Sequence, residues 1–272
     1  MPHTTPLSGQ FKALHTAPNA LVIPNAWDAA SAALFADAGA SAVATSSASL
    51  AWSLGYADGG SLPRTELLAA VRRIQRVLHI PLTVDLEDGY SNDPQAVAAL
   101  VAEVAALGVA GINLEDGAQP PGLLADKIAA SRQALGNTPL FINARTDVYL
   151  RGMAKGDAAV AMAVERATLY HAAGADGLFV PGMSGVDDTA RVASQTMLPL
   201  NLMLLPSMPN ISDLFAVGAR RFTAGPATFQ TAYGHARTLA LALLKDHRAE
   251  GLFANPVGYD AMNALFTDSP PG

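Results

Sequence analysis

Eight short apolar runs, each followed by a longer stretch of helical period, constrain the fold of this sequence more than any other feature. The runs predict strands near residues 21–27, 42–46, 82–86, 111–115, 140–146, 177–181, 199–205 and 220–224. The stretches between them predict helices, for example over residues 28–38, 64–78, 94–107 and 157–173. Strands that alternate with helices form a parallel sheet covered by helices. Eight such units predict a (β/α)₈ TIM barrel of the α/β class, with an open doubly wound sheet as the alternative.

The length and composition agree with a single barrel domain over residues 1–272. Barrels of this kind commonly have roughly 250 residues, and this chain has 272, of which 50% are hydrophobic and 15% are charged. Such a composition supports a large buried core. We expect residues 252–272 to form a C-terminal helical tail, whose apolar face, within residues 252–266, would pack on a neighbouring subunit.

Composition also excludes several functional classes. The formal net charge is −6 and no basic stripe is present, which excludes nucleic acid as an expected partner. The chain has no cysteine, so disulfides, thiolate metal sites and a cysteine nucleophile are excluded. The first residues lack the pattern of a signal peptide, and no apolar run approaches the roughly 20 residues that span a bilayer. We therefore expect a cytoplasmic protein that has no membrane partner.

Acidic residues converge from three consecutive βα units on the face where barrel active sites lie. Asp85 and Glu87 follow the third predicted strand, Glu115 ends the fourth, and the long loop after the second strand contributes Asp58. Crowded carboxylates raise one another's pKa, and a divalent cation relieves that repulsion. An oxygen-only ligand set favours Mg²⁺, with Mn²⁺ as the alternative. We expect Asp85 to bind the cation directly and the other three acids to act partly through water.

Other charged residues near the strand ends have competing interpretations. Arg145 is the one cation at the end of a predicted strand, and its planar fork suits a substrate carboxylate. A structural ion pair with Glu115 or Asp147 is the alternative. Asp88, Asp116 and Asp147 are interpreted as N-caps of the helices that follow them.

The segment after the second predicted strand has two notable features. Ser46, Ser47 and Ala48 are expected to run into a loop, in which their backbone N–H groups would bind an anion. The glycine-rich residues 52–63 then make the connection unusually long. They form either part of the active site or a solvated surface loop.

Residues that are missing from the strand ends narrow the mechanism. No predicted strand ends in lysine, which disfavours a Schiff-base aldolase. The six histidines lie in the N-terminal arm, in predicted helices or at helix ends, so a Ser-His-Asp triad has no support. We expect these histidines at surface or helix-end positions.

The motifs that contain these residues resemble those of the isocitrate lyase/phosphoenolpyruvate mutase superfamily, over roughly residues 24–234. LGYADGG resembles the segment with the family's loop aspartate, here Asp58. VDLEDGY is similar to its metal motif, which places metal roles on Asp85 and Glu87. GINLEDG resembles the segment with a further acid, Glu115, and INARTD the segment with the substrate-binding arginine, Arg145.

The resemblance implies a barrel, Mg²⁺, and an enolate or oxyanion of a small 2-oxoacid that the metal stabilises. It also implies a homodimer or homotetramer in which a C-terminal helix is exchanged between subunits. The lyase branches carry a Lys-Lys-Cys-Gly-His loop after the fourth strand, whereas residues 117–127 here, GAQPPGLLADK, contain neither Cys nor His. We therefore identify the chain as a divergent member that lacks the cysteine loop, and expect no cleavage of isocitrate or 2-methylisocitrate.

The leading functional hypothesis is Mg²⁺-dependent C–C cleavage or decarboxylation of a small 2-oxo or 2-hydroxy mono- or dicarboxylate. Asp85 would bind the substrate through the metal, while Arg145 and the N–H groups of residues 46–48 would hold its carboxylate. Asp58 is the candidate general base or water-orienting group. The alternatives are P–C bond chemistry on a phosphonopyruvate-like substrate and a 2-oxoacid-binding protein without turnover.

Overall fold

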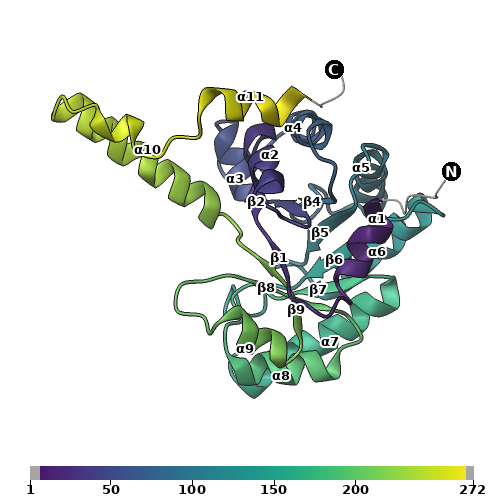
Figure 1. Cartoon of the computed structure of the whole chain (residues 1–272). Helices are drawn as coiled ribbons and strands as arrows, with labels where there is room; N and C mark the ends of the chain where they lie inside the picture. The colour runs from purple at the N-terminus through teal and green to yellow at the C-terminus, as the bar shows by residue number, and fades with distance from the viewer. Residues whose placement is uncertain (1–6, 268–272) are drawn as a thin grey trace.

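The computed structural model describes residues 7–267 and contains a nearly closed parallel barrel (Figure 1). The strands are β1 (Leu21–Ile23), β2 (Asn25–Ala26), β3 (Val43–Thr45), β4 (Leu82–Asp85), β5 (Gly111–Glu115), β6 (Phe141–Arg145), β7 (Gly177–Phe179), β8 (Leu200–Met203) and β9 (Ala219–Thr223). β1 and β2 are two segments of one strand that is interrupted at Pro24, which has no N–H to donate. β1 pairs with β9 and β2 pairs with β3. The eight predicted strands are therefore confirmed, and the open doubly wound alternative is wrong.

Helices surround the barrel, and the predicted ones end within two residues of their expected bounds. They are α2 (Ala29–Asp37), α3 (Ser47–Ser53), α4 (Arg64–Arg76), α5 (Pro94–Ala106), α6 (Pro121–Leu135), α7 (Asp157–Ala173), α8 (Val186–Gln195) and α9 (Ile211–Ala216). Asp28 caps α2, accepting a hydrogen bond from the Ser31 N–H at 2.7 Å. Gly174 ends α7 in the left-handed region at φ 104°, which favours glycine. Local cap chemistry thus fixes where these helices begin and end.

A helix that the sequence analysis did not predict, α1 (Leu7–Leu14), closes the amino end of the barrel. Its Phe11 is fully buried, and the Phe11 ring centroid lies 5.4 Å from that of Phe141. Gly111 makes room for this ring, because a Cβ there would lie 2.7 Å from Phe11 Cε1. His15 directly follows α1, so its expected helix-end position is confirmed, but it is buried and stacks on Phe141 at 4.0 Å, so the alternative surface position is wrong. Because α1 covers the amino end of the barrel, the carboxyl end of the strands is the open face.

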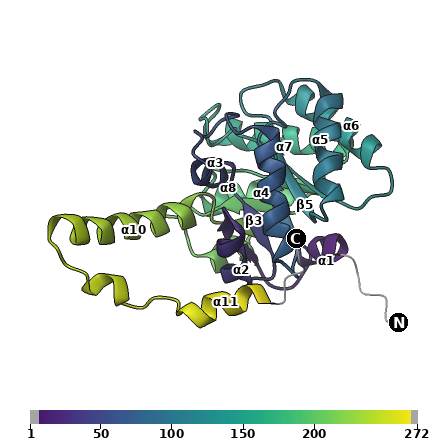
Figure 2. The same ribbon diagram turned by 90° about the horizontal axis from the view of Figure 1, so that it is seen from above.

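The C-terminal helices leave the barrel and then return to it. α10 (Ala227–Lys245) projects away from the barrel, η1 (Glu250–Phe253) packs beside its far end, and α11 (Tyr259–Thr267) returns to lie against α2 (Figures 1 and 2). Phe229 is the one buried residue in α10. The expected tail helix is α11, whereas residues 268–272 of the predicted tail lie outside the described residues.

The helices between residues 7 and 267 give no candidate membrane span. None of them combines the length and the apolar character that crossing a bilayer requires.

Candidate active site

A cavity of about 180 Å³ opens at the carboxyl end of the barrel strands. Of the predicted site residues, Ser46, Ser47, Ala48, Asp58, Asp85 and Arg145 line it. Glu87 and Glu115 lie beside the cavity rather than in its lining, and their charges still act on Asp85 or Arg145. The structure therefore brings together residues that are up to 99 positions apart in the sequence, from Ser46 to Arg145.

Asp85 is the last residue of β4 and sits at the base of the acidic group. Its backbone N–H donates to Thr45 Oγ1 at 2.9 Å, which joins the ends of β3 and β4. Its carboxylate accepts long hydrogen bonds from the Glu87 N–H at 3.2 Å and the Ser47 N–H at 3.5 Å. Burial raises the pKa of Asp85 and the Asp58 charge adds to that increase, whereas Arg145 opposes it. Additional positive charge at this position would therefore favour the ionised carboxylate.

The loop after β4 holds a second carboxylate in an unusual backbone conformation. Glu87 and Tyr90 have positive φ angles of 51° and 60°, a region that non-glycine residues seldom adopt. The Glu87 carboxylate accepts hydrogen bonds from the Tyr90 side chain and the Gly60 backbone. Burial raises its pKa, and Asp85 and Asp58 add to the shift. Lys127, buried on α6, donates to the Asp88 carbonyl at 2.7 Å and so connects this loop to α6.

Arg145 and Glu115 end neighbouring strands and lie opposite each other in the β5–β6 register. Arg145 Nη1 is 2.8 Å from Glu115 Oε2, and its Nε and Nη2 donate to the Asp147 carboxylate at 2.7 and 3.2 Å. Burial raises the pKa of Glu115 to about 8, with Arg145 opposing the shift. The structural ion pairs considered as the alternative for Arg145 are thus present, and the guanidinium still lines the cavity.

The interpretation of three acids as helix caps is wrong. The caps of α5, α6 and α7 are Asp93, Pro120 and Gly156. Asp116 instead accepts hydrogen bonds from the Asp147 N–H at 3.0 Å, Arg166 at 2.7 Å and the Tyr170 hydroxyl at 2.5 Å. Asp147 binds Arg145 and Arg151, and Asp88 accepts from the Tyr90 N–H in a local turn. The pattern of an acid just before a helix was misleading because the connecting loops continue for several residues beyond these positions.

The expected loop at Ser46–Ala48 is also wrong, because these residues begin α3. Ser46 is the N-cap, and its Oγ accepts from the Ser49 N–H at 3.5 Å. Ser47 and Ala48 form the first turn, in which the Ser47 N–H donates a long hydrogen bond to Asp85 at 3.5 Å and the helix dipole favours an anion as the expected loop would have done. The serine before an apolar run was the signal for a helix start. The glycine-rich loop that carries Asp58 is correspondingly shorter and follows α3.

A buried cation lies in the barrel interior below the acids. Arg221 of β9 is fully buried, and its Cζ lies 5.5 Å from the centroid of the Phe11 ring. Burial lowers the pKa of this guanidinium to about 9, with the charge of Asp85 opposing the shift. The sequence analysis did not identify this residue because it lies within a strand rather than at its end.

Sequence reasoning also missed the uncharged part of the cavity lining. It consists of polar residues at the base, Asn25, Thr45, Asn113 and Thr223, and apolar residues on one side, Leu150, Phe179, Pro181, Met203 and Pro226. The apolar residues follow or end β6, β7, β8 and β9. Their positions at strand ends are a signal in the sequence, but apolar residues there look the same as residues of the barrel core.

The geometry of the acidic group determines what kind of metal ion it can bind. Within residues 7–267, no three His, Asp or Glu side chains converge closely enough to form an all-protein metal cluster. Mg²⁺ usually keeps several waters and takes one or two carboxylates, so it does not need such a cluster. Asp85 accepts only two long backbone hydrogen bonds and is surrounded by other acids. The residues present therefore fit a largely hydrated Mg²⁺ ion.

Comparison with known proteins places these features in a family. The family model for phosphoenolpyruvate phosphomutase matches residues 11–244. An uncharacterised Mycobacterium tuberculosis protein (strain H37Rv) is 35% identical over 80% of this chain and 83% of its own. An oxaloacetate decarboxylase of Bradyrhizobium sp. (strain BTAi1) is 35% identical over 65% of this chain and 62% of its own length.

A solved structure gives the same assignment. The crystal structure of a putative phosphonomutase from Burkholderia cenocepacia J2315 has a TM-score of 0.83 and 36% identity, and the match covers 87% of this chain and 99% of that one. The motifs identified in the sequence, the parallel barrel and these matches agree. The chain belongs to the phosphoenolpyruvate phosphomutase family, within the phosphoenolpyruvate mutase/isocitrate lyase superfamily, and is a member without cysteine.

Proposed function

We propose that this protein is a Mg²⁺-dependent lyase that cleaves a C–C bond in, or decarboxylates, a small 2-oxo or 2-hydroxy carboxylate. The observation that supports this proposal best is the small cavity in which Asp58, Asp85 and Arg145 meet at the carboxyl end of the strands. The relatives named as an oxaloacetate decarboxylase and, in Bacillus subtilis, a 2-methylisocitrate lyase act on substrates of this class by name.

Asp85 is the residue we assign to direct metal binding, and Asp58, Glu87 and Glu115 would bind through water. When bound, Mg²⁺ supplies Lewis-acid stabilisation of negative charge that develops on a substrate oxygen. Asp85 is the best direct ligand because it is buried, lines the cavity and has few competing donors. The more peripheral acids add negative charge that retains the cation without filling its coordination sphere.

The remaining residues of the cavity would bind and orient the substrate. The N–H groups at the start of α3, from Ser47 and Ala48, suit one carboxylate, and Arg145 provides a charged donor beside it. Asp58 is exposed enough to exchange protons with solvent and lines the cavity, so we assign it the role of general base or water-orienting group. We assign no general acid to residues 117–125, because Gln119 is the one polar side chain before Asp126 and cannot donate a catalytic proton at neutral pH.

The experiment that tests this proposal is a calorimetric titration of Mg²⁺, followed by turnover assays against a panel of 2-oxoacids with Mg²⁺ or with chelator. We expect binding to wild type, loss of binding in Asp85→Ala, and turnover only with Mg²⁺. The far-ultraviolet circular dichroism spectrum should not change in the variant, since Asp85 faces the cavity. Turnover of phosphonopyruvate alone would indicate P–C chemistry, and ligand binding without any turnover would indicate a binding protein. Unchanged Mg²⁺ affinity in the variant would contradict the metal assignment.

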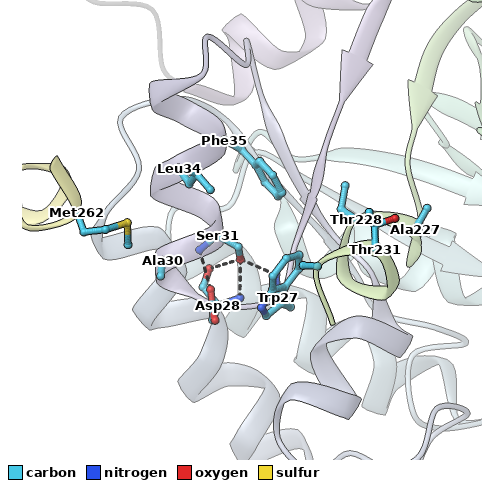
Figure 3. Close-up of a pocket in the computed structure, with 11 residues that line it drawn as sticks. Trp27, Asp28, Ala30, Ser31, Leu34, Phe35, Ala227, Thr228, Thr231 and Met262 are labelled. Carbon is cyan, nitrogen blue, oxygen red and sulfur yellow. Dashed lines mark hydrogen bonds between the residues drawn. The ribbon is translucent and has the colours of Figure 1, made fainter. Parts of the chain in front are cut away.

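We propose in addition that the protein is a homo-oligomer in which α10 of one subunit packs on the barrel of its partner. An apolar groove of about 600 Å³ runs between α2, α10 and α11, and Trp27, Leu34, Phe35 and Met262 are among its lining residues (Figure 3). On the far part of α10, Leu241 and Leu244 are exposed and lie three positions apart, on one face. A helix that buries so little of its surface is only marginally stable in water, which supports the proposal that α10 contacts a partner subunit.

Sedimentation-equilibrium measurements at micromolar concentration test this arrangement. Wild type should sediment as a dimer or tetramer, and Leu244→Asp should shift the population towards monomer by placing a charge in the interface. Met197→Asp is the matched control, because Met197 is 83% exposed but lies on the opposite end of the barrel from α10. A monomeric wild type, or equal effects of the two variants, would refute the proposed interface.

A further inference from the structure

The cavity has two chemically different sides. One side carries the acids, at the end of β4 and in the loop before α4, and Arg145 at the end of β6 lies at the border, with its Cζ 5.8 Å from the centroid of the Phe179 ring. The other side is formed by Leu150, Phe179, Pro181, Met203 and Pro226. None of these five side chains can donate a hydrogen bond or carry a charge. A ligand with its polar end at the acids therefore directs its other end towards an apolar surface.

Positive charge for a second carboxylate is scarce in this cavity. Among the described residues that line it, Arg145 is the one cation. Its guanidinium is already within 2.8 Å of Glu115 and 2.7 Å of Asp147. A dicarboxylate would place one negative group among these acids and the other against the apolar side. Burying a carboxylate without a partner is costly, because the charge loses its hydration without compensation.

Asn25 and Thr223, two uncharged polar residues of the lining on strands next to the apolar side, already have hydrogen-bond partners. Asn25 Nδ2 donates to the Thr45 carbonyl at 2.7 Å, and Asn25 Oδ1 accepts from the Gly225 N–H at 2.9 Å. Thr223 Oγ1 donates to the Leu202 carbonyl at 3.4 Å. These side chains are therefore committed to the strand ends and have little capacity to solvate an additional anion.

We propose that the substrate is a 2-oxo monocarboxylate with a hydroxyl group on C4 and a short apolar group beyond it. Cleavage of its C3–C4 bond would transfer the 4-hydroxyl proton to Asp58 and release an aldehyde that carries the apolar group, while the pyruvate enolate left behind would take a proton from solvent. This inference rests on the proposed function and specifies its substrate class. The carboxylate and the neighbouring oxygen lie at the acidic side with the cation, and the alkyl group contacts Leu150, Phe179 and Met203. A volume of about 180 Å³ is small beside the roughly 300–1,000 Å³ of pockets for drug-sized ligands, so the apolar group has only a few carbons.

A matched set of stable 2-hydroxyacids tests the inference by calorimetry at saturating Mg²⁺. Malate and 2-hydroxy-4-methylpentanoate differ in that an isopropyl group replaces the second carboxylate, and lactate has neither group. A buried methylene contributes a factor of roughly four in affinity. We therefore expect the branched acid to bind at least roughly tenfold more tightly than both lactate and malate. Malate binding that equals or exceeds that of the branched acid would overturn the inference and leave the proposed function intact.

Variants at the rim of the apolar side give a second, independent result. Leu150 is 46% exposed, so substitution there leaves the core intact. Leu150→Arg should increase malate affinity at least roughly tenfold by supplying the missing charge, whereas Leu150→Gln, which adds only polarity, should not. An Arg variant that gains nothing for malate would also overturn the inference. Pyruvate serves as the reference ligand: if it fails to bind with Mg²⁺, the proposed function fails; if it binds while the branched acid does not, only the substrate class fails.

Discussion

Asp116 provides the sharpest test of how the site is held together. Its side chain is fully buried and receives three hydrogen bonds, including the 2.7 Å ion pair with Arg166, whose side chain is 11% exposed. Asp116→Asn preserves the shape of the side chain but leaves the Arg166 guanidinium without a counter-charge. Removing one partner of a buried ion pair costs about 3–5 kcal/mol, because the other charge stays desolvated. We therefore expect the free energy of unfolding to fall by that amount.

Thermal unfolding followed by circular dichroism measures this loss. In a protein of this size about 1 kcal/mol corresponds to a Tm change of roughly 2–4 °C, so the variant should melt about 6–20 °C below wild type. Glu103→Gln is the matched control, since Glu103 pairs with Arg64 at the same 2.7 Å but is 54% exposed. That change should cost no more than about 1 kcal/mol. Similar Tm values for the two variants would refute the argument that burial increases the contribution of the Asp116–Arg166 ion pair to stability.

Four further predictions concern the active-site end of the barrel. Arg145→Lys should weaken Mg²⁺-dependent pyruvate binding by roughly 1.5–3 kcal/mol in calorimetry, because an ammonium cannot reproduce the planar fork; binding within twofold of wild type would indicate a purely structural ion pair. Burial raises the pKa of Glu115 from 4.5 to about 8, so its proton competes with the cation. Mg²⁺ affinity should therefore rise as the pH increases towards 8 and then level off; a pH-independent affinity would contradict this coupling. Stability without metal should fall over pH 4.5 to about 8, because the unfolded chain releases this proton first. Finally, a coupled assay should detect no glyoxylate release from isocitrate, since residues 117–125 supply no acid; turnover above about 1 s⁻¹ would show that another residue replaces it.

The barrel could be predicted because each strand leaves a local signal. Short apolar runs and the helix stops at Gly39, Gly108 and Gly174 mark the βα units, and all three glycines have positive φ angles. α1 could not be recognised in the same way, because its role depends on one contact over a long sequence distance. Phe11 fills the barrel end only because Gly111, 100 positions later, has no side chain.

The candidate site was only partly predictable, for a related physical reason. The acids and Arg145 could be located because the carboxyl ends of parallel barrel strands lie on one face, where barrel active sites form. A residue's position at a strand end gives no information on its side-chain partners. The sequence therefore favours a helix cap for Asp116, although this residue binds Arg166, 50 positions away. The apolar side of the cavity was missed because a residue such as Met203 looks like an ordinary core residue in sequence. Only the closed barrel places it opposite Asp85.

We propose that a cation at Asp85 would allow this cavity to form the enolate of a 2-oxoacid by removing a proton from the carbon next to its carbonyl group. Exchange of the C3 protons of pyruvate with deuterated water, followed by nuclear magnetic resonance, measures that step without requiring the natural substrate to be known. We expect wild type with Mg²⁺ to accelerate exchange above the rate without enzyme, and expect chelator or the Asp85→Asn substitution to abolish the acceleration. Acceleration that persists in chelator or in the variant, or that is absent in wild type with saturating Mg²⁺, would contradict the account.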